Sequence, residues 1–226
     1  MRKDQLRRRL LLTGILIVAA LGLLWLQQTN STMTFRQRML KTIYPALMWA
    51  TRLGNKNTMV LTHAPQKAPV SFYDLQATLT NGAPIDWALL KGKKVLIVNT
   101  ASDCGYTGQY KELQQLQDKF ADRLQVIGFP ANDFKEQEKG SNASIAAFCE
   151  RNYGVRFFLT QKTSVVPGAL QHPVYRWLTD STKNGWNSKA PTWNFSKYLI
   201  DEDGRLTHYF DPSVSPLSET VVTAIQ

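Results

Sequence analysis

Two short, continuous apolar runs, at 95–100 and 124–130, are typical of buried β-strands. Each run is followed by a stretch, 107–121 and 142–151, in which apolar residues recur every three or four positions, as on one face of a helix. A strand, a helix and a second strand in this order form a parallel pair with a right-handed crossover. We therefore expect a parallel core in this part of the chain.

Turn signals and helical spacing predict the elements around this core. They are a hairpin over 71–87 turning at Asn81 and Gly82, a helix over 172–180, a hairpin over 197–210 turning at Asp203 and Gly204, and a helix over 217–225. A parallel core with a terminal hairpin and helix predicts an α/β thioredoxin-like fold, with a central mixed sheet flanked by helices.

The stretch from Leu10 to Leu26 carries no charge and follows the three arginines Arg7 to Arg9. It is just long enough to cross a bilayer as a transmembrane helix, and its positive flank favours the cytoplasmic side. A cleaved signal peptide needs small residues after its apolar run, where this chain has WLQQTNSTM. We expect an uncleaved signal-anchor in the inner membrane with the following domain on the periplasmic side, and cleavage is the alternative.

Residues 33–53 mix apolar and basic side chains and predict a helix that either lies on the membrane surface or packs against the domain. Pro45 should break or kink this helix. Residues 54–69 have the composition of a linker. The chain thus divides into a cytoplasmic basic segment at 1–9, the signal-anchor at 10–26, a juxtamembrane helix and linker at 27–69, and the domain at 70–226.

The net charge of +10 is concentrated in the N-terminal part of the chain. Residues 1–60 hold ten Lys or Arg against one acid, which leaves 17 basic and 16 acidic residues in 61–226. A nearly neutral domain offers no basic face for phosphates. We therefore expect no nucleic-acid partner, and we expect the tethered domain to be a monomer.

Cys104 lies where the strand at 95–100 gives way to a polar, glycine-containing turn before the next helix. The N-terminus of that helix would favour a thiolate, which is the nucleophilic form of cysteine. Polar neighbours such as Ser102 and Asp103 predict that the thiol is presented rather than packed. The alternative is a small buried hydrophobe, the commonest fate of a free cysteine.

Three separated motifs resemble those of the glutathione peroxidase family, and the likeness extends over about 71–225. They are VNTASDCGYTGQY, GFPANDFKEQEKGSN and WNFSKYLIDEDG. The resemblance implies a peroxidatic Cys104 surrounded by Gln137, Trp193 and Asn194, in an enzyme that reduces hydrogen peroxide or organic and lipid hydroperoxides. It also implies glutathione or a thioredoxin-like protein as reductant, and no bound cofactor.

The chemistry suits these residue types. A cysteine thiolate attacks one peroxide oxygen and becomes a sulfenic acid, while the other oxygen leaves as water or alcohol. The amides of Gln137 and Asn194 and the indole of Trp193 can donate hydrogen bonds to the developing anion. Taken singly, each has an ordinary alternative: Trp193 as a core aromatic, Gln137 as a solvated side chain and Asn194 as a turn residue.

The chain also departs from the family pattern. Lys135 and Glu136 stand where glycines are common, Lys139 and Gly108 replace prolines, and Asp133 stands where glutamine is frequent. These differences affect the shape of the loops and substrate access, and leave the four presumed catalytic residues intact.

Cys149 lies on the helix predicted at 142–151. In family members that use thioredoxin, a resolving cysteine lies in or near this position, so the resemblance implies that Cys149 attacks the sulfenic acid of Cys104 and forms a disulfide. An external dithiol would then restore both thiols. A buried helix cysteine and a static structural disulfide are the alternatives.

Two other function classes remain to be weighed. A membrane-tethered thiol-disulfide oxidoreductase would carry a C-x-x-C pair, but Thr107 stands three residues after Cys104. A non-catalytic binding module with this scaffold would not need the intact set of presumed catalytic residues. His63, His172 and His208 are scattered and lie far from both cysteines in the sequence, so we expect no metal site.

Overall fold

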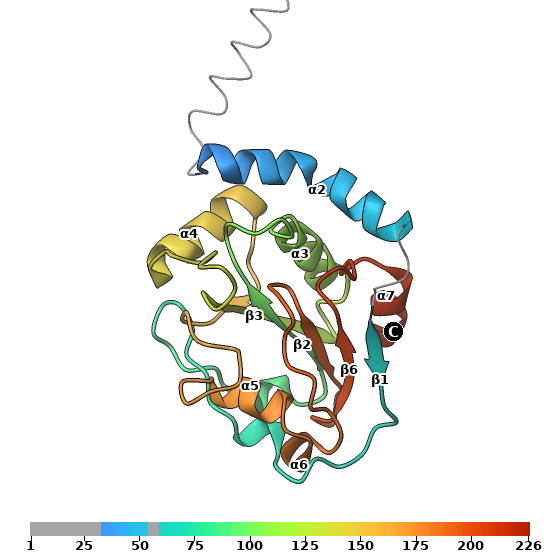
Figure 1. Ribbon diagram of the computed structural model, residues 1–226. Coiled ribbons are helices and arrows are strands. Elements are labelled where there is room, and N and C mark those ends of the chain that lie inside the picture. The colour runs from blue at the N-terminus through green and yellow to red at the C-terminus, as the bar shows by residue number, and fades with distance from the viewer. Residues whose placement is uncertain (1–32, 54–58) are drawn as a thin grey trace, which may run out of the picture. The chain divides into compact units, whose positions relative to one another are not determined.

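A six-stranded mixed sheet, in the order β1-β6-β5-β2-β3-β4, is the centre of the computed structural model, which describes residues 33–53 and 59–226 (Figure 1). The strands are β1 (Val60–Thr62), β2 (Lys94–Thr100), β3 (Leu124–Pro130), β4 (Phe158–Leu159), β5 (Lys197–Ile200) and β6 (Leu206–Phe210). The helices are α2 (Phe35–Leu53), η1 (Phe72–Asp74), η2 (Trp87–Leu90), α3 (Gln109–Lys119), α4 (Asn142–Tyr153), α5 (Pro173–Leu178), α6 (Ser181–Asn184) and α7 (Glu219–Ile225).

The predicted parallel core is confirmed. Strands β2, β3 and β4 are parallel, with α3 and α4 as the crossover helices, whereas β5 runs antiparallel to β2 and β6 antiparallel to β5. The carboxyl ends of β2 and β3 and the start of β5 therefore meet at one edge of the sheet. This thioredoxin-like arrangement brings together three loops that are far apart in the sequence.

Side chains on β2 alternate between two apolar clusters, one on each face of the sheet. Leu96 and Val98 join the cluster that α3, α4 and α7 cover. Val95 and Ile97 join the cluster that contains side chains of α5, η1 and η2. Because both faces are covered, residues 95–98 of β2 are all apolar and show no polar alternation, which explains the continuous run in the sequence.

The hairpin expected at 71–87 is only partly formed. The turn at Asn81 and Gly82 is present, and a single antiparallel bridge joins Thr78 to Pro84, but the flanking segments form η1 and η2 instead of strands. Pro84 has no N–H to extend the ladder. Asp86 then accepts a hydrogen bond from the N–H of Ala88 and starts η2.

The segment expected as linker at 54–69 contains a strand. Val60 to Thr62 form β1, which pairs antiparallel with residues 208–210 of β6. The outer edge of β6 would otherwise offer unpaired backbone groups, and β1 covers it. The part of this segment at 54–58 lies outside the described residues.

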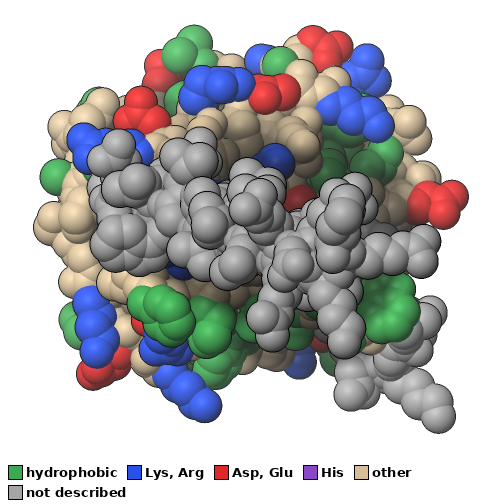
Figure 2. Space-filling model, turned by 90° about the horizontal axis from the view of Figure 1, so that it is seen from above, with side chains coloured by type: hydrophobic (Ala, Val, Ile, Leu, Met, Phe, Trp, Pro, Cys, Tyr) green, Lys and Arg blue, Asp and Glu red, His purple; other side chains and the backbone are tan. Residues whose placement is uncertain are grey.

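Helix α2 continues through Pro45 and packs beside α3 and α4 (Figure 1). The hydroxyl of Tyr44 donates to Glu112 Oε1 at 2.6 Å, and Lys41 Nζ donates to the carbonyl of Asn152 at 2.9 Å. Of the expected break or kink at Pro45, the break does not occur: Lys41 is exposed, so the carbonyl that Pro45 leaves unpaired can bond to water. Apolar and basic side chains both reach the surface at this end of the molecule (Figure 2).

The predicted signal-anchor at 10–26 lies outside the described residues. Within 33–53 and 59–226, no helix has the length and hydropathy needed to span a bilayer.

Candidate active site

Backbone hydrogen bonds tie together the three loops at the shared edge of the sheet. The N–H of Asp103, in the loop after β2, donates to the carbonyl of Gln137 in the loop after β3 at 3.0 Å. At the end of β2, Asn99 Nδ2 donates to the carbonyl of Trp193 at 3.0 Å, and the Asn99 carbonyl accepts from the N–H of Phe195 at 2.6 Å. The loops are therefore fixed to β2 and to each other.

These loops bring the predicted site residues together. The side chains of Trp193 and Asn194 lie near enough to the sulfur of Cys104 to lower the pKa of its thiol as hydrogen-bond donors. Asn194 Nδ2 also donates to Gln137 Oε1 at 2.9 Å, which links the glutamine to the group. The Oδ1 atom of Asn194 is buried and has no hydrogen-bond donor among the described residues.

Cys104 itself is packed, contrary to the expectation from its polar neighbours. Its exposed fraction is 0%, and it belongs to the apolar cluster on the α3 and α4 side of the sheet. Burial raises the pKa of the thiol, and this outweighs the opposite effect of hydrogen bonds from the Tyr106 N–H, at 3.4 Å, and from Trp193 and Asn194. The predicted help from a helix N-terminus is weak, because α3 begins only at Gln109.

Thr107 holds the shape of the Cys104 loop. Its hydroxyl oxygen accepts a hydrogen bond from the N–H of Cys104 at 3.0 Å and lies 2.7 Å from the Cys104 carbonyl, to which it can donate. In the sequence, Thr107 drew attention as the residue that stands where a C-x-x-C pair would have its second cysteine. Its position three residues after Cys104 was a usable signal, since threonine hydroxyls commonly bond to nearby backbone groups.

A buried acid, Glu138, lies next to Gln137. Its burial was not predicted, because many residues in the surrounding loop are charged. It is 1% exposed, and the hydroxyl of Ser102 donates to its Oε2 at 3.1 Å. Burial raises the pKa of Glu138 to about 7, against a smaller lowering by Ser102 and Lys162. The carboxyl group thus connects the loop after β3 to the loop that carries Cys104.

A buried cation supports the turn that carries Trp193 and Asn194. Phe195 has a left-handed backbone, with φ of 70°, which is unusual for a bulky residue. Lys197 is completely buried, and its Nζ donates to the Phe195 carbonyl at 2.8 Å. Burial lowers the pKa of Lys197 to about 7, while Glu112 and Asp211 act in the opposite direction.

Comparison with known proteins identifies the family. A sequence model of glutathione peroxidase matches residues 72–179. A glutathione peroxidase of Lactococcus lactis is 42% identical over 65% of this chain and 93% of its own length. The chain belongs to the glutathione peroxidase family. A glutathione peroxidase-like peroxiredoxin of Saccharomyces cerevisiae is 42% identical over 66% of this chain and 93% of its own length.

The fold agrees with this assignment. The crystal structure of T. cruzi GPX1 is 30% identical, covers 69% of this chain and 94% of its own, and superposes with a TM-score of 0.53. Family membership identifies the chain as a thiol-dependent peroxidase. The predicted thioredoxin-like α/β fold is confirmed, and the predicted roles of individual site residues remain predictions.

The second cysteine lies apart from the peroxidase site residues, in the middle of α4. Cys149 is completely buried and shares an apolar cluster with Cys104, and both thiols are free. Burial raises the pKa of Cys149 strongly, and the nearby Glu138 adds to this effect. An attack by Cys149 would therefore require a proton to leave a buried thiol.

Two departures from the family pattern now have a structural explanation. Lys135 and Glu136, which stand where glycines are common, both have φ of 51°, the left-handed conformation that glycine adopts without strain. A Cβ at Gly108 would lie 2.3 Å from the ring of Tyr44, so the absence of a side chain there makes room for α2.

The histidines have packing and capping contacts. His63 stacks on Trp186, His208 stacks on Phe210, and His172 Nδ1 accepts from the N–H of Val174 at the start of α5. Within the described part of the chain, no group of three or more His, Cys, Asp or Glu side chains is placed to hold a metal ion.

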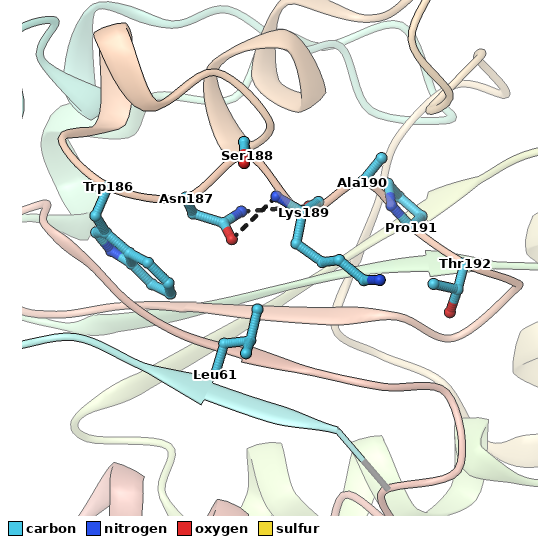
Figure 3. A pocket seen from close by; sticks show the side chains of 8 residues that line it. All are labelled: Leu61, Trp186, Asn187, Ser188, Lys189, Ala190, Pro191 and Thr192. Atoms are coloured by element: carbon cyan, nitrogen blue, oxygen red, sulfur yellow. Dashed lines mark hydrogen bonds between the residues drawn. The ribbon is translucent and has the colours of Figure 1, made fainter. Parts of the chain in front are cut away.

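A hollow of about 550 Å³ lies beside the site, along the loop that leads into Trp193 (Figure 3). It is lined by Leu61 and residues 186–192, and the side chain of Lys189 extends along it. None of the predicted site residues lines it. The hollow is therefore a neighbouring surface feature and does not give access to the sulfur of Cys104.

Proposed function

We propose that Cys104 is the residue at which this peroxidase reduces hydrogen peroxide or organic hydroperoxides. The sulfur attacks one peroxide oxygen, an S–O bond forms as the O–O bond breaks, and the second oxygen leaves as water or alcohol with the proton that the thiol gives up. The observation that carries this proposal is the hydrogen bonding of Trp193 and Asn194 to the sulfur, with Gln137 bonded to Asn194.

Peroxide consumption by the full chain tests the role of Cys104. Cys104→Ser should abolish turnover, because a hydroxyl cannot form the sulfenic acid. Cys149→Ser should retain the first reduction of peroxide in a single turnover. Equal steady-state rates for the wild type and Cys104→Ser would refute the assignment.

Cys149 resolves the sulfenic acid in this proposal. Its thiolate attacks the Cys104 sulfur, an S–S bond forms, the S–O bond breaks and water leaves, after which glutathione or a thioredoxin-like dithiol reduces the disulfide. The shared apolar cluster supports this pairing. Mass spectrometry after one equivalent of peroxide should find Cys104 joined to Cys149; a free Cys149 beside an oxidised or glutathionylated Cys104 would favour a one-cysteine cycle.

The chain is also proposed to be anchored in the inner membrane by residues 10–26, with the peroxidase domain on the periplasmic side. The arginines that precede this apolar segment support this orientation. Phospholipid hydroperoxides then become accessible substrates. Protease treatment of spheroplasts should remove the domain, and protection from the protease would contradict this orientation.

A further inference from the structure

Helix α2 has an inner face that is fitted to the Cys104 loop. Tyr44 and Met48 are buried, with exposed fractions of 8% and 5%. The ring of Tyr44 lies against Gly108, and Arg36 forms an ion pair with Asp103 at 3.1 Å. The helix therefore rests directly on the segment that carries the peroxidatic cysteine.

The outer face of the same helix is apolar and exposed. Phe35 is 82% exposed, Met39 48%, Ile43 47% and Trp49 64%. Phe35, Met39 and Ile43 are spaced by four residues, so they form one stripe along the helix, and Trp49 extends this face by its position in the helical repeat. Other large exposed apolar side chains, such as Leu89 and Leu170, lie in other segments of the chain.

The charges on α2 have one sign. The helix contains no Asp or Glu. Arg36 and Lys41 reach toward the domain, where they contact Asp103 and the carbonyl of Asn152, and Arg38 donates to the carbonyl of Met33. Positive charges attract anionic headgroups over roughly 8 to 10 Å at physiological salt, so these side chains need not touch the lipid. An apolar stripe with basic neighbours complements an anionic lipid surface.

The sequence before α2 also favours a lipid surface. The uncharged stretch ends at Leu26, and the residues from Gln27 to Thr34 span at most about 28 Å even when fully extended. If the stretch lies in the bilayer, as in the proposed function, α2 begins close to the membrane surface.

We propose that the outer face of α2, formed by Phe35, Met39, Ile43 and Trp49, lies in the interface of an anionic membrane. The inner face then holds the Cys104 loop about one helix diameter, or ~10 Å, from the lipid surface. The membrane contact would place the site next to phospholipid hydroperoxides. This choice of substrate class rests on the proposed peroxidase function.

A fluorescent label tests the surface without reference to activity. Ile43→Cys, in a full chain with Cys104 and Cys149 replaced by Ser, is labelled with a polarity-sensitive dye and reconstituted in vesicles that contain anionic phosphatidylglycerol and a nitroxide phospholipid. Leu170→Cys is the matched control, since Leu170 is 85% exposed but belongs to another segment. The label at 43 should be quenched at least threefold more than the label at 170.

Equal quenching at the two positions would overturn the proposal. The proposal would also be overturned if the dye at position 43 reported an apolar environment without vesicles and did so more strongly at higher protein concentration. A second copy of the chain would then cover this face. Vesicles of neutral phosphatidylcholine should give weaker quenching, and equal quenching in both lipids would contradict the role of the basic side chains.

Activity provides a second test that does not depend on labelling. The triple variant Phe35→Ser, Met39→Ser and Ile43→Ser should lose about tenfold in rate on phospholipid hydroperoxide in anionic vesicles and keep its rate on hydrogen peroxide. The control variant Leu89→Ser and Leu170→Ser should change neither rate. An equal loss of rate on both substrates, or no loss on either, refutes the lipid contact. If the wild type is inactive on both substrates, the proposed peroxidase function fails, and the labelling experiment still shows whether α2 contacts the membrane.

Discussion

The buried carboxyl group of Glu138 should make the stability of the domain depend on pH. Burial raises its pKa from 4.5 to about 7, so the folded state holds the proton more tightly than the unfolded chain does. Folding therefore takes up a proton between these pH values, and stability falls as the pH rises from about 4.5 to 7. At about 1.4 kcal/mol for each pH unit, the ionised group costs about 3 kcal/mol above pH 7.

Glu138→Gln removes the ionisation and keeps a side-chain oxygen that can accept from Ser102. Urea unfolding of the full chain in mild detergent, followed by tryptophan fluorescence, should show that this variant gains about 2 to 3 kcal/mol over the wild type between pH 5 and pH 8. Glu136→Gln is the control, because Glu136 lies in the same loop and its side chain is 74% exposed. A difference between Glu138→Gln and the wild type that stays constant within about 0.5 kcal/mol across this range would refute the reasoning.

Three further substitutions test the supports of the site. Gly108→Ala places a Cβ 2.3 Å from the Tyr44 ring, so trypsin should cleave α2 faster than in the wild type, and Tyr44→Ala should remove most of that difference. Lys197→Met leaves the Phe195 carbonyl without its buried donor, and urea unfolding should show a loss of about 1 to 3 kcal/mol together with lower turnover. Lys135→Gly relieves a backbone with φ of 51° at an exposed position and should raise the unfolding free energy by up to about 1 kcal/mol, as thermal unfolding can measure.

The meeting of the Cys104 and Gln137 loops could be predicted because it follows from the order of the strands. The apolar runs that form β2 and β3 are clear and are separated by a helical pattern, so their parallel pairing and their common carboxyl edge could be predicted from the sequence. The position of Trp193 and Asn194 at the same edge was implied by the resemblance to the glutathione peroxidase family, because the sequence does not show that β5 pairs with β2. The hydrogen bond between Asn194 and Gln137 is the result of this topology.

The burial of Cys104 could not be predicted, because its polar neighbours find partners far away in the sequence. Ser102 bonds to Glu138, and Asp103 pairs with Arg36 of α2. Local composition shows that these side chains are polar and gives no information on what satisfies them. The short strand β1 was not predicted for a similar reason. Its three residues form a strand because β6 offers an open edge, and that edge is distant in the sequence.

The burial that raises the pKa of Cys104 also explains how the surrounding donors can act. In a site shielded from water, hydrogen bonds to a developing anion are stronger than in solution. The N–H of Tyr106 and the side chains of Trp193 and Asn194 already point at the sulfur, so little reorganisation is needed when charge appears there. In the proposed mechanism, the thiol gives up its proton as the peroxide bond breaks, when the leaving oxygen needs that proton. A buried thiol surrounded by these donors therefore suits the proposed reaction, in which charge develops at the sulfur and the leaving oxygen as the O–O bond breaks.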